Sequence, residues 1–354
     1  MEHFSEVLNR ENPSNPICEI EIELPDEIEE IDTSEPSRAE VKKAIGHLKN
    51  GKAPGIDNIQ AELLKDDIGY ATTKVKEIID IVWRDEKTPR KWRKGLIVKL
   101  PKKGNLKERK NWRGITLLSV VSKVMGGIVI DRIRAGVESK LRKGQTGFRP
   151  GRGTTEQVFI LRNIIEQSKE WQSSLYVNFI DFEKAFDSVH RDSLWLIMRS
   201  YGIPSKLVSM VKALYDDFEC AVVDCQDTTE WFKIQTGVKQ GCNMSGLLFL
   251  LVFDWVMRNT LQEGNTGIRW KFNTKLEDLE FADDIALLSS TRQHIQTKTD
   301  KLTHEAERVR LKVNVDKCKL TPVPAVTGHD KCWPSFHFIY FSILMFCRRK
   351  SSFQ

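Results

Sequence analysis

Three aspartates stand at positions where a negative charge is costly unless a cation compensates it. Asp181 follows directly after the apolar run 175–180. Asp283 and Asp284 are adjacent within the largely apolar stretch 281–288, where burial and mutual repulsion would both raise their free energy. Carboxylate oxygens are the ligands that Mg²⁺ prefers, and two such ions about 3.5–4 Å apart catalyse in-line displacement at phosphorus. The pattern is compatible with this chemistry, and an ordinary exposed Asp-Asp turn is the alternative for Asp283 and Asp284. The position of Asp181 after an apolar strand argues against that alternative but does not determine the reaction.

The motifs of several other enzyme classes are missing from the sequence. There is no GxxxxGK[ST], HExxH or GxSxG segment, and Gly151-Arg152-Gly153 lacks the third glycine of a dinucleotide fingerprint. The seven cysteines form no CxxC pair, which argues against a zinc site or a disulfide framework. No secretory signal is visible, and the apolar run 336–346 is about half of a membrane span. We therefore expect an intracellular protein, nuclear or cytoplasmic, that does not enter a membrane.

The predicted elements place the three aspartates at strand ends. The run 175–180 is typical of a strand that ends at Asp181, and 279–289 of two strands with Asp283 and Asp284 at the bend. Two further strand pairs are predicted over 96–101 with 112–118 and over 219–224 with 231–236. Helical patterns cover 37–50, 61–83, 119–141, 154–171, 191–201, 206–218, 245–258 and 291–311. Because strands and helices mix without regular βαβ alternation, we expect the α+β class.

The net charge of +6 conceals two opposite blocks. Residues 1–40 hold 13 acidic and 2 basic side chains, a net charge of −11, and we expect 1–37 to be an acidic, disordered leader or linker. The window 87–152 holds 20 basic side chains against 3 acidic ones, a net charge of +17. Such a block marks a surface for a polyanion, with a merely solvated Lys-rich face as the alternative.

Several segments, in this order along the chain, resemble the motifs of reverse transcriptases. Asn178–Val189, with Phe179-Ile180-Asp181-Phe182 at its start, is similar to the first palm motif, and Gly237–Cys242 is similar to the second. Phe281-Ala282-Asp283-Asp284 is similar to the third and Leu311–Lys317 to the fourth. Segments 50–57, 111–119 and 145–149 resemble parts of the fingers. The sequence is most similar to polymerases of non-LTR (LINE-type) retrotransposons, especially the RTE-like branch, over about residues 38–320.

The resemblance implies a right-hand polymerase fold with an antiparallel palm sheet. Residues 38–170 would form the fingers, 171–320 the palm, and 321–354 a tail unlike the family, with the thumb largely missing. It also implies RNA-directed DNA polymerase activity, the transfer of dNTPs to the 3′-hydroxyl of a DNA primer on an RNA template. In this family the thumb grips the duplex. A chain that lacks the thumb has as its main alternative the role of an inactive remnant, which binds RNA or RNA–DNA hybrid without copying it.

The resemblance assigns roles at the catalytic centre. Asp181 and Asp283 would hold two Mg²⁺ ions, or Mn²⁺ in their place, with Asp284 assisting and the carbonyl of Phe182 as a further ligand. Phe186 would lie under the sugar and exclude a 2′-hydroxyl by steric contact. This role argues against an RNA-dependent RNA polymerase, which must accept that hydroxyl.

Further residues would bind the incoming nucleotide. Gln240 and Gly241 would line the nucleotide pocket, where glycine permits a close approach of the backbone. Arg113, with Lys102 or Lys103 of the basic hairpin, would clamp the triphosphate, a task that suits the fixed fork of arginine.

The remaining implied contacts involve pyrophosphate, template and primer. Lys317 would protonate the pyrophosphate or support the template. Arg149 and Arg152 would contact template or primer phosphates. Asp187 and Arg149 match the family pattern, and a structural role is the alternative for both. The start of a helix is a sufficient reason for Asp187. Arg149, in a Gly-rich basic loop, suits contact with template phosphates equally well.

Overall fold

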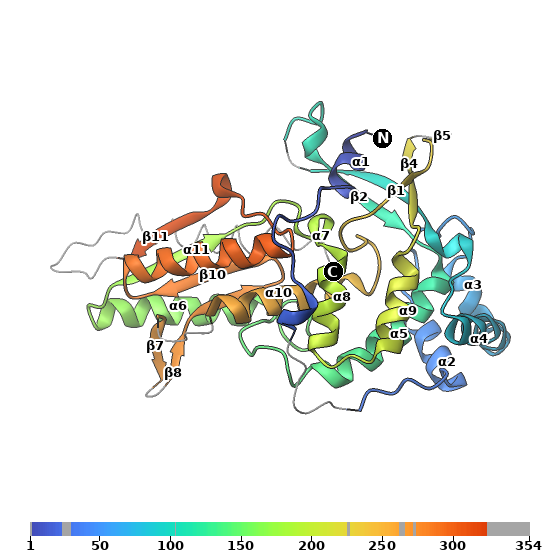
Figure 1. Ribbon diagram of the computed structural model, residues 1–354, viewed down its shortest axis with the longest axis horizontal. Coiled ribbons are helices and arrows are strands. Elements are labelled where there is room, and N and C mark those ends of the chain that lie inside the picture. The colour runs from blue at the N-terminus through green and yellow to red at the C-terminus, as the bar shows by residue number, and fades with distance from the viewer. Residues whose placement is uncertain are drawn as a thin grey trace. The chain divides into compact units, whose positions relative to one another are not determined.

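The computed structural model describes residues 2–22, 30–102, 104–224, 227–261, 266–271 and 274–323. The chain divides into two compact units. The first comprises Met1–Lys140 and Phe186–Leu251, and the second Leu141–Ala185 and Val252–Gln354. The range 171–320, expected to form one palm, is therefore shared between them. Each unit combines helices with a sheet of its own, which confirms the α+β class (Figure 1).

The sheet of the first unit has the strand order β2-β1-β4-β5, and β6 also pairs with β4. The expected hairpin of β1 with β2 and the expected antiparallel pair of β4 with β6 are both present. β1 also pairs with β4 in parallel, and this pairing joins segments so far apart in the sequence that no local pattern predicts it. The strands are β1 (Lys94–Pro101), β2 (Trp112–Leu117), β4 (Glu219–Asp224), β5 (Asp227–Thr228) and β6 (Phe232–Lys233).

Most helices of the first unit begin and end close to the expected positions, but the helix expected over 61–83 is divided at Asp67 into Ala61–Asp66 and Ile68–Asp85. The helix that starts after Ser37 has the expected capping box, in which the Glu40 amide donates to Ser37 Oγ and the Ser37 amide to Glu40 Oε2. It ends at Gly46, earlier than the predicted end at residue 50. The helices are α1 (Glu2–Leu8), α2 (Arg38–Gly46), α3 (Ala61–Asp66), α4 (Ile68–Asp85), α5 (Val120–Val137), α8 (Arg191–Ser200) and α9 (Ser205–Tyr215), with short 3-10 turns at Glu19–Glu21, Arg90–Arg93 and Arg109–Asn111.

Part of the N-terminal segment that was expected to be disordered is helical. Phe4 and Leu8 of α1 pack against a core that includes Ile97 of β1 and Val222 of β4. The Phe4 ring lies so close to Gly114 of β2 that a Cβ there would be 2.9 Å from it. The acidic composition therefore gives an incomplete account of this segment, because two of its apolar side chains, Phe4 and Leu8, pack on the sheet.

The sheet of the second unit is antiparallel throughout and has the order β11-β3-β10-β9. Its strands are β3 (Leu175–Ile180), β9 (Asp278–Phe281), β10 (Asp284–Ser289) and β11 (Lys319–Val323); β7 (Ile268–Lys271) and β8 (Thr274–Leu276) form a separate hairpin. The expected strand–turn–strand over 279–289 is therefore present. Helices α6 (Thr154–Glu170) and α11 (Arg292–Arg308) belong to this unit, and α7 (Ala185–Ser188) and α10 (Ser245–Leu261) run across the division between the units.

Alternating side chains of β3 lie on opposite faces of the sheet, as the pleat of a strand requires. Val177 and Phe179 share a buried cluster with Leu161 and Ile165 of α6. On the other face, Asn178 Nδ2 donates to Thr299 Oγ1 of α11 at 2.9 Å. The sheet is thus covered by α6 on one face and by α11 on the other (Figure 1). Strand β3 ends at Ile180, directly before Asp181.

The last strand continues past the expected end of the palm. β11 pairs with β3 as far as Val323, so three residues of the tail expected over 321–354 belong to this sheet. Residues 324–354 lie outside the described part of the chain. Among the residues that are described, no helix has both the length and the apolar character that a membrane span requires.

Candidate functional site

The second unit carries the three predicted acidic residues at one end of its sheet. Ile180, the last residue of β3, pairs with Ile285 of β10, and continuing that register by one residue sets Asp181 opposite Asp284. Phe281 pairs with Asp284 across the β9–β10 hairpin, so Ala282 and Asp283 form a two-residue turn. Ala282 has φ +58°, a left-handed conformation that is uncommon for a residue with a Cβ. The hairpin therefore places Asp283 and Asp284 beside the end of β3.

Asp181 is held by the segment that follows α11. Its carbonyl accepts a hydrogen bond of 2.8 Å from the Asn314 amide, and its Oδ2 lies 3.0 Å from Lys317 Nζ. Lys317 stands in the 3-10 turn Val315–Lys317, within the expected fourth motif. Lys317 was predicted to contact pyrophosphate or support the template, and in the structure its ammonium lies on the Asp181 carboxylate.

The acidic residues suit a hard cation in their chemistry but are not gathered into a ligand cage. Asp284 is buried and Asp283 is half-buried. Across the described ranges, no group of three or more His, Cys, Asp or Glu side chains is arranged to hold a metal ion. Their carboxylate oxygens are the donor type that Mg²⁺ takes, and an ammonium already lies beside Asp181. The donor set therefore suits a divalent ion in its chemistry.

Phe182 was predicted to offer its carbonyl to a metal ion. In the structure its ring is packed in the core of the second unit. The side chain is buried and packs edge-on against Phe253, with ring centroids 5.9 Å apart. Its backbone forms an antiparallel bridge with Val313. These contacts fix the chain directly after Asp181.

The first unit carries the residues predicted to face the nucleotide. The Phe186 ring stacks on Phe249 with centroids 4.4 Å apart and planes inclined by 15°. The Phe186 carbonyl accepts a 2.8 Å hydrogen bond from the Val238 amide. Gln240 Nε2 donates to Asp187 Oδ1 at 2.8 Å. The turn 237–242 is therefore bound to the segment that carries Phe186.

Gly241 stands where the backbone of β2 approaches closely. It has φ +114°, and a Cβ at this position would lie 2.3 Å from the carbonyl oxygen of Thr116. The Thr116 amide donates to the Gln240 carbonyl at 2.7 Å. Only glycine combines this φ with this close approach.

The basic residues of the β1–β2 hairpin lie on and just beyond its strands. Arg113 is half-buried in β2 and pairs with Leu100 of β1. Lys102 is exposed, and its amide donates to the Asn111 carbonyl at 2.7 Å, which closes the hairpin. Lys103 lies outside the described residues.

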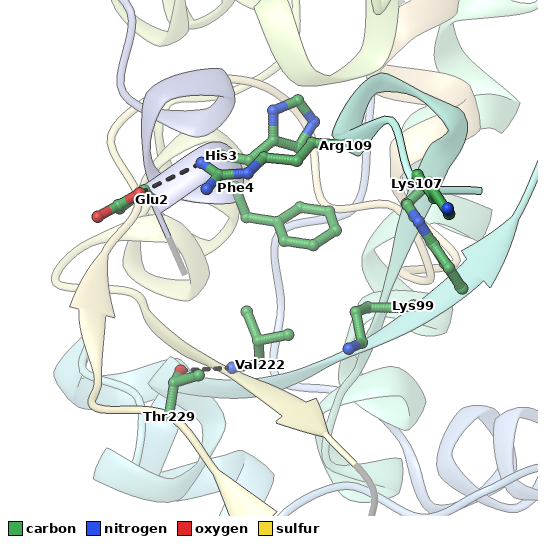
Figure 2. A pocket seen from close by; sticks show the side chains of 9 residues that line it. Glu2, His3, Phe4, Lys99, Lys107, Arg109, Val222 and Thr229 are labelled. Carbon is green, nitrogen blue, oxygen red and sulfur yellow. Dashed lines mark hydrogen bonds and ion pairs between the residues drawn. The ribbon is translucent and has the colours of Figure 1, made fainter. Parts of the chain in front are cut away.

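A pocket of about 480 Å³ opens on the same sheet, beneath α1. Figure 2 shows Lys99, Lys107 and Arg109 around it, with the ion pair of Glu2 and Arg109 at its rim. None of the predicted site residues in the described ranges lines this pocket. Its three cations and Trp112 belong to the basic block 87–152 that the sequence analysis identified.

The two arginines predicted to contact template or primer bind loop carbonyls. Arg149 is buried and its Nη1 donates to the carbonyls of Arg142 at 2.8 Å and Gln145 at 3.1 Å. The exposed Arg152 donates to the Lys143 carbonyl at 3.0 Å. For Arg149 these contacts match a structural role, which was the alternative to a contact with template phosphates.

Two groups near these segments were not found by reasoning from the sequence. One is an ionic cluster of Arg142, Asp278 and Glu280 beside the β9–β10 hairpin. The other is Lys239, a buried residue of the turn 237–242. Neither group had a clear local signal, because Asp278 and Glu280 alternate with apolar residues as on a solvent-facing strand, and Lys239 lies beside the polar Gln240 in a turn.

The sequence model of the family described as reverse transcriptase (RNA-dependent DNA polymerase) matches residues 100–331 of the chain. The chain belongs to the reverse transcriptase family. The matched range includes Asp181, Asp283 and Asp284, the segment that carries Phe186, the turn 237–242, and β11.

Relatives of this reverse transcriptase are proteins of non-LTR retrotransposons, as the motifs predicted. The Pol polyprotein of the type-2 retrotransposable element R2DM of Drosophila melanogaster is 28% identical over 266 residues, 75% of this chain and 24% of that protein. The probable RNA-directed DNA polymerase from transposon BS of the same organism is 28% identical over 288 residues, 78% and 31%. The 149 kDa protein of transposon TX1 of Xenopus laevis is 27% identical over 251 residues, 71% and 19%. The chain thus spans a fifth to a third of these relatives.

The solved structures with a similar fold include telomerases. Telomerase from Candida tropicalis with a fragment of telomeric RNA matches with TM-score 0.51 and 13% identity, over 75% of this chain and 45% of that one. Apo telomerase from the same organism, truncated from its C-terminal domain, matches with TM-score 0.50 and 15% identity, over 80% and 59%. At this identity the likeness concerns the fold, and it confirms the expected right-hand polymerase type.

Proposed function

We propose that this chain catalyses RNA-directed DNA synthesis, adding dNTPs to the 3′-hydroxyl of a DNA primer paired with RNA. The observation that carries the proposal is the register of β3 and β10, which sets Asp181 opposite Asp284 with Asp283 in the adjoining turn. In a chain of the reverse transcriptase family, carboxylates in this arrangement suit divalent metal chemistry.

Asp181, Asp283 and Asp284 are the proposed ligands of two Mg²⁺ ions. When bound, such ions lower the pKa of the primer hydroxyl and neutralise the charge of the triphosphate and leaving pyrophosphate. The residues around the aspartates keep the ligands in place. Val313 and Asn314 hold the backbone after β3, and Lys317 keeps the Asp181 carboxylate paired when no divalent ion is bound.

Six further residues are the proposed nucleotide contacts. Phe186 is proposed to exclude a 2′-hydroxyl, and its stacking on Phe249 supports this role because it fixes the orientation of the ring. Gln240 and Gly241 would line the nucleotide pocket, and Arg113, Lys102 and Lys103 would bind phosphate. The basic surface of β1 and β2 supports RNA template and DNA primer as partners.

One observation favours binding without synthesis as a second candidate. Within the described ranges the aspartates do not form a ligand group of three, and an ammonium occupies the Asp181 carboxylate. A protein that cannot release this contact would retain affinity for RNA–DNA hybrid and incorporate no nucleotide.

Incorporation of dTTP on poly(rA)/oligo(dT) with Mg²⁺ separates the two candidates. The comparison uses wild type, Asp181→Asn, Asp283→Asn and the control Asp300→Asn, which changes an exposed aspartate of α11. We expect incorporation by wild type and the control, and a loss of at least about 10³-fold in the other two variants with hybrid binding retained. Hybrid binding without incorporation by wild type would instead establish the second candidate.

A further inference from the structure

A cluster of ionised and amide side chains lies beside the hairpin that carries Asp283. Arg142 Nη2 is 2.6 Å from Asp278 Oδ1, and Arg142 Nη1 binds Glu280 Oε1. Gln145 Nε2 donates to Glu280 Oε2 at 2.9 Å. The side chains of Asp278 and Glu280 are 4% and 0% exposed, so Arg142 is shared between two carboxylates that water hardly reaches.

We infer that Arg142 is a positioning residue, which fixes strand β9 and through it the turn that holds Asp283. The inference rests on the proposed function, in which Asp283 binds a metal ion, but it concerns residues to which that function gives no role.

The segment 145–147 connects the cluster to the turn. Thr146 Oγ1 donates to the Glu280 carbonyl at 2.8 Å. A Cβ on Gly147 would lie 2.0 Å from the amide nitrogen of Ala282, so the chain passes directly against the turn at this point. Gly147 donates its amide to Gln145 Oε1 at 2.7 Å, and the same Gln145 binds Glu280. Displacement of Glu280 would therefore move strand β9, which leads into the turn, and the segment 145–147, which lies against the turn.

The cluster is also anchored to α10. The Arg142 amide donates to Asp254 Oδ1 at 2.8 Å, and Arg258 Nε lies 2.6 Å from Asp254 Oδ2. Asp254 is fully buried. The backbone of Arg142 is thus fixed by a helix while its side chain fixes a strand, which is the arrangement needed to hold β9 at a defined position.

The electrostatics of the cluster require the guanidinium. Burial and the neighbouring negative charge of Asp278 raise the pKa of Glu280, against the attraction of Arg142. Burial would also raise the pKa of Asp278, but the charge of Arg142 and hydrogen bonds from Glu280 and Arg142 lower it overall. The charge of Arg142 therefore favours the ionised form of Asp278. Without Arg142 that ionised group would be buried and uncompensated, which is strongly unfavourable.

The turn needs this support because its backbone conformation is unfavourable. Ala282 has φ +58°, and a non-glycine residue in that region persists only where the surroundings impose it. Gly147 lies directly against Ala282, and Thr146 binds the carbonyl of Glu280, two residues before it. A small movement of the turn would move Asp283, and misplacement of a reacting group by about 1 Å costs about 100-fold in rate.

The test compares Arg142→Gln and Arg142→Lys with the control Arg162→Gln, which removes an exposed ion pair with Glu166 on α6. A fourth variant exchanges the charges, Arg142→Glu with Glu280→Arg. The readouts are dTTP incorporation, split into kcat and KM, and amide hydrogen exchange at residues 281–285 and in α11.

For Arg142→Gln we expect kcat to fall about 100-fold, KM for dTTP to change less than about 2-fold, and exchange at 281–285 to accelerate with α11 unchanged. Arg142→Lys, which keeps the charge but loses the fork, and the charge exchange should each recover part of the loss. Exchange at 281–285 equal to wild type, or accelerated equally in α11, would overturn the inference. If wild type incorporates no dTTP, the proposed function fails, and the exchange measurement alone decides the role of Arg142.

Discussion

The carboxylate of Asp181 already has a cation beside it in the absence of metal. Lys317 Nζ lies 3.0 Å from Asp181 Oδ2, and the Lys317 side chain is 49% exposed, so it can move into solvent. A divalent ion that approaches Asp181 meets the repulsion of this ammonium. The pair is partly exposed and therefore worth at most about 1 kcal/mol, which slightly weakens metal binding without preventing it.

Removal of this ammonium should strengthen metal binding. For Lys317→Met we expect Mn²⁺ to bind about 2–5-fold more tightly, because Asp181 no longer has to exchange one cation for another. Titration of Mn²⁺ followed by electron paramagnetic resonance measures this affinity. Lys312→Met is the matched control, because Lys312 lies 3.9 Å from Glu183 and is not paired with Asp181. Weaker Mn²⁺ binding in Lys317→Met would mean that the lysine supports the metal site instead of competing for it.

At the scale of elements, the turn 237–242 carries a lysine in an apolar environment. Lys239 is buried, donates to the Leu214 carbonyl, and has its Nζ 3.4 Å from the centre of the Phe218 ring and 4.7 Å from that of Tyr215. Burial lowers the pKa of Lys239 from 10.5 to about 7. Folding of this turn is therefore coupled to the loss of a proton in neutral and alkaline solution.

The coupling predicts that stability rises with pH. Between about pH 7 and 10.5 the unfolded chain keeps the Lys239 proton and the folded chain loses it, so the free energy of unfolding increases with pH. Cys220, whose pKa burial raises from 9.0 to about 12, opposes this only above pH 9. We expect Lys239→Met to remove a rise on the order of 2 kcal/mol between about pH 7 and 9, measured by urea unfolding. The same slope in wild type and variant would contradict the prediction.

The elements around the site could be predicted from the sequence to different degrees. The strand before Asp181 and the hairpin 279–289 follow from local patterns. The first is an apolar run that ends at Asp181, and the second has Asp283 and Asp284 at a bend before a further apolar run. β11 does not, because its five residues form a strand only by pairing with β3. The ionic cluster was hidden for a related reason. Asp278 and Glu280 alternate with apolar residues in β9, a pattern that predicts a solvent-facing side, but Arg142 compensates them inside the unit.

At the scale of the whole molecule, the block of positive charge in 87–152 is not a uniform surface. Arg132 is 6% exposed in its side chain and pairs with Glu40 and Asp32, and Arg149 is buried on loop carbonyls. By contrast Arg109, at the pocket on the β1–β2 sheet, is 72% exposed (Figure 2). The net charge of +17 therefore overstates the charge available to nucleic acid, because buried arginines of this block bind carboxylates and carbonyls of the protein itself.

The salt dependence of hybrid binding distinguishes these two kinds of arginine. Each cation that contacts phosphate releases a counterion, so its removal lowers the slope of log K against log salt concentration by about 1. We expect this change for Arg109→Gln, with little effect on stability. Arg132→Gln should leave the slope unchanged and destabilise the protein by about 3 kcal/mol, because it leaves Glu40 without its bidentate partner. Fluorescence anisotropy of a labelled RNA–DNA hybrid over a salt series gives the slopes, and urea unfolding gives the stabilities. An equal change of slope in both variants would mean that exposure does not determine which arginines contact the phosphate backbone.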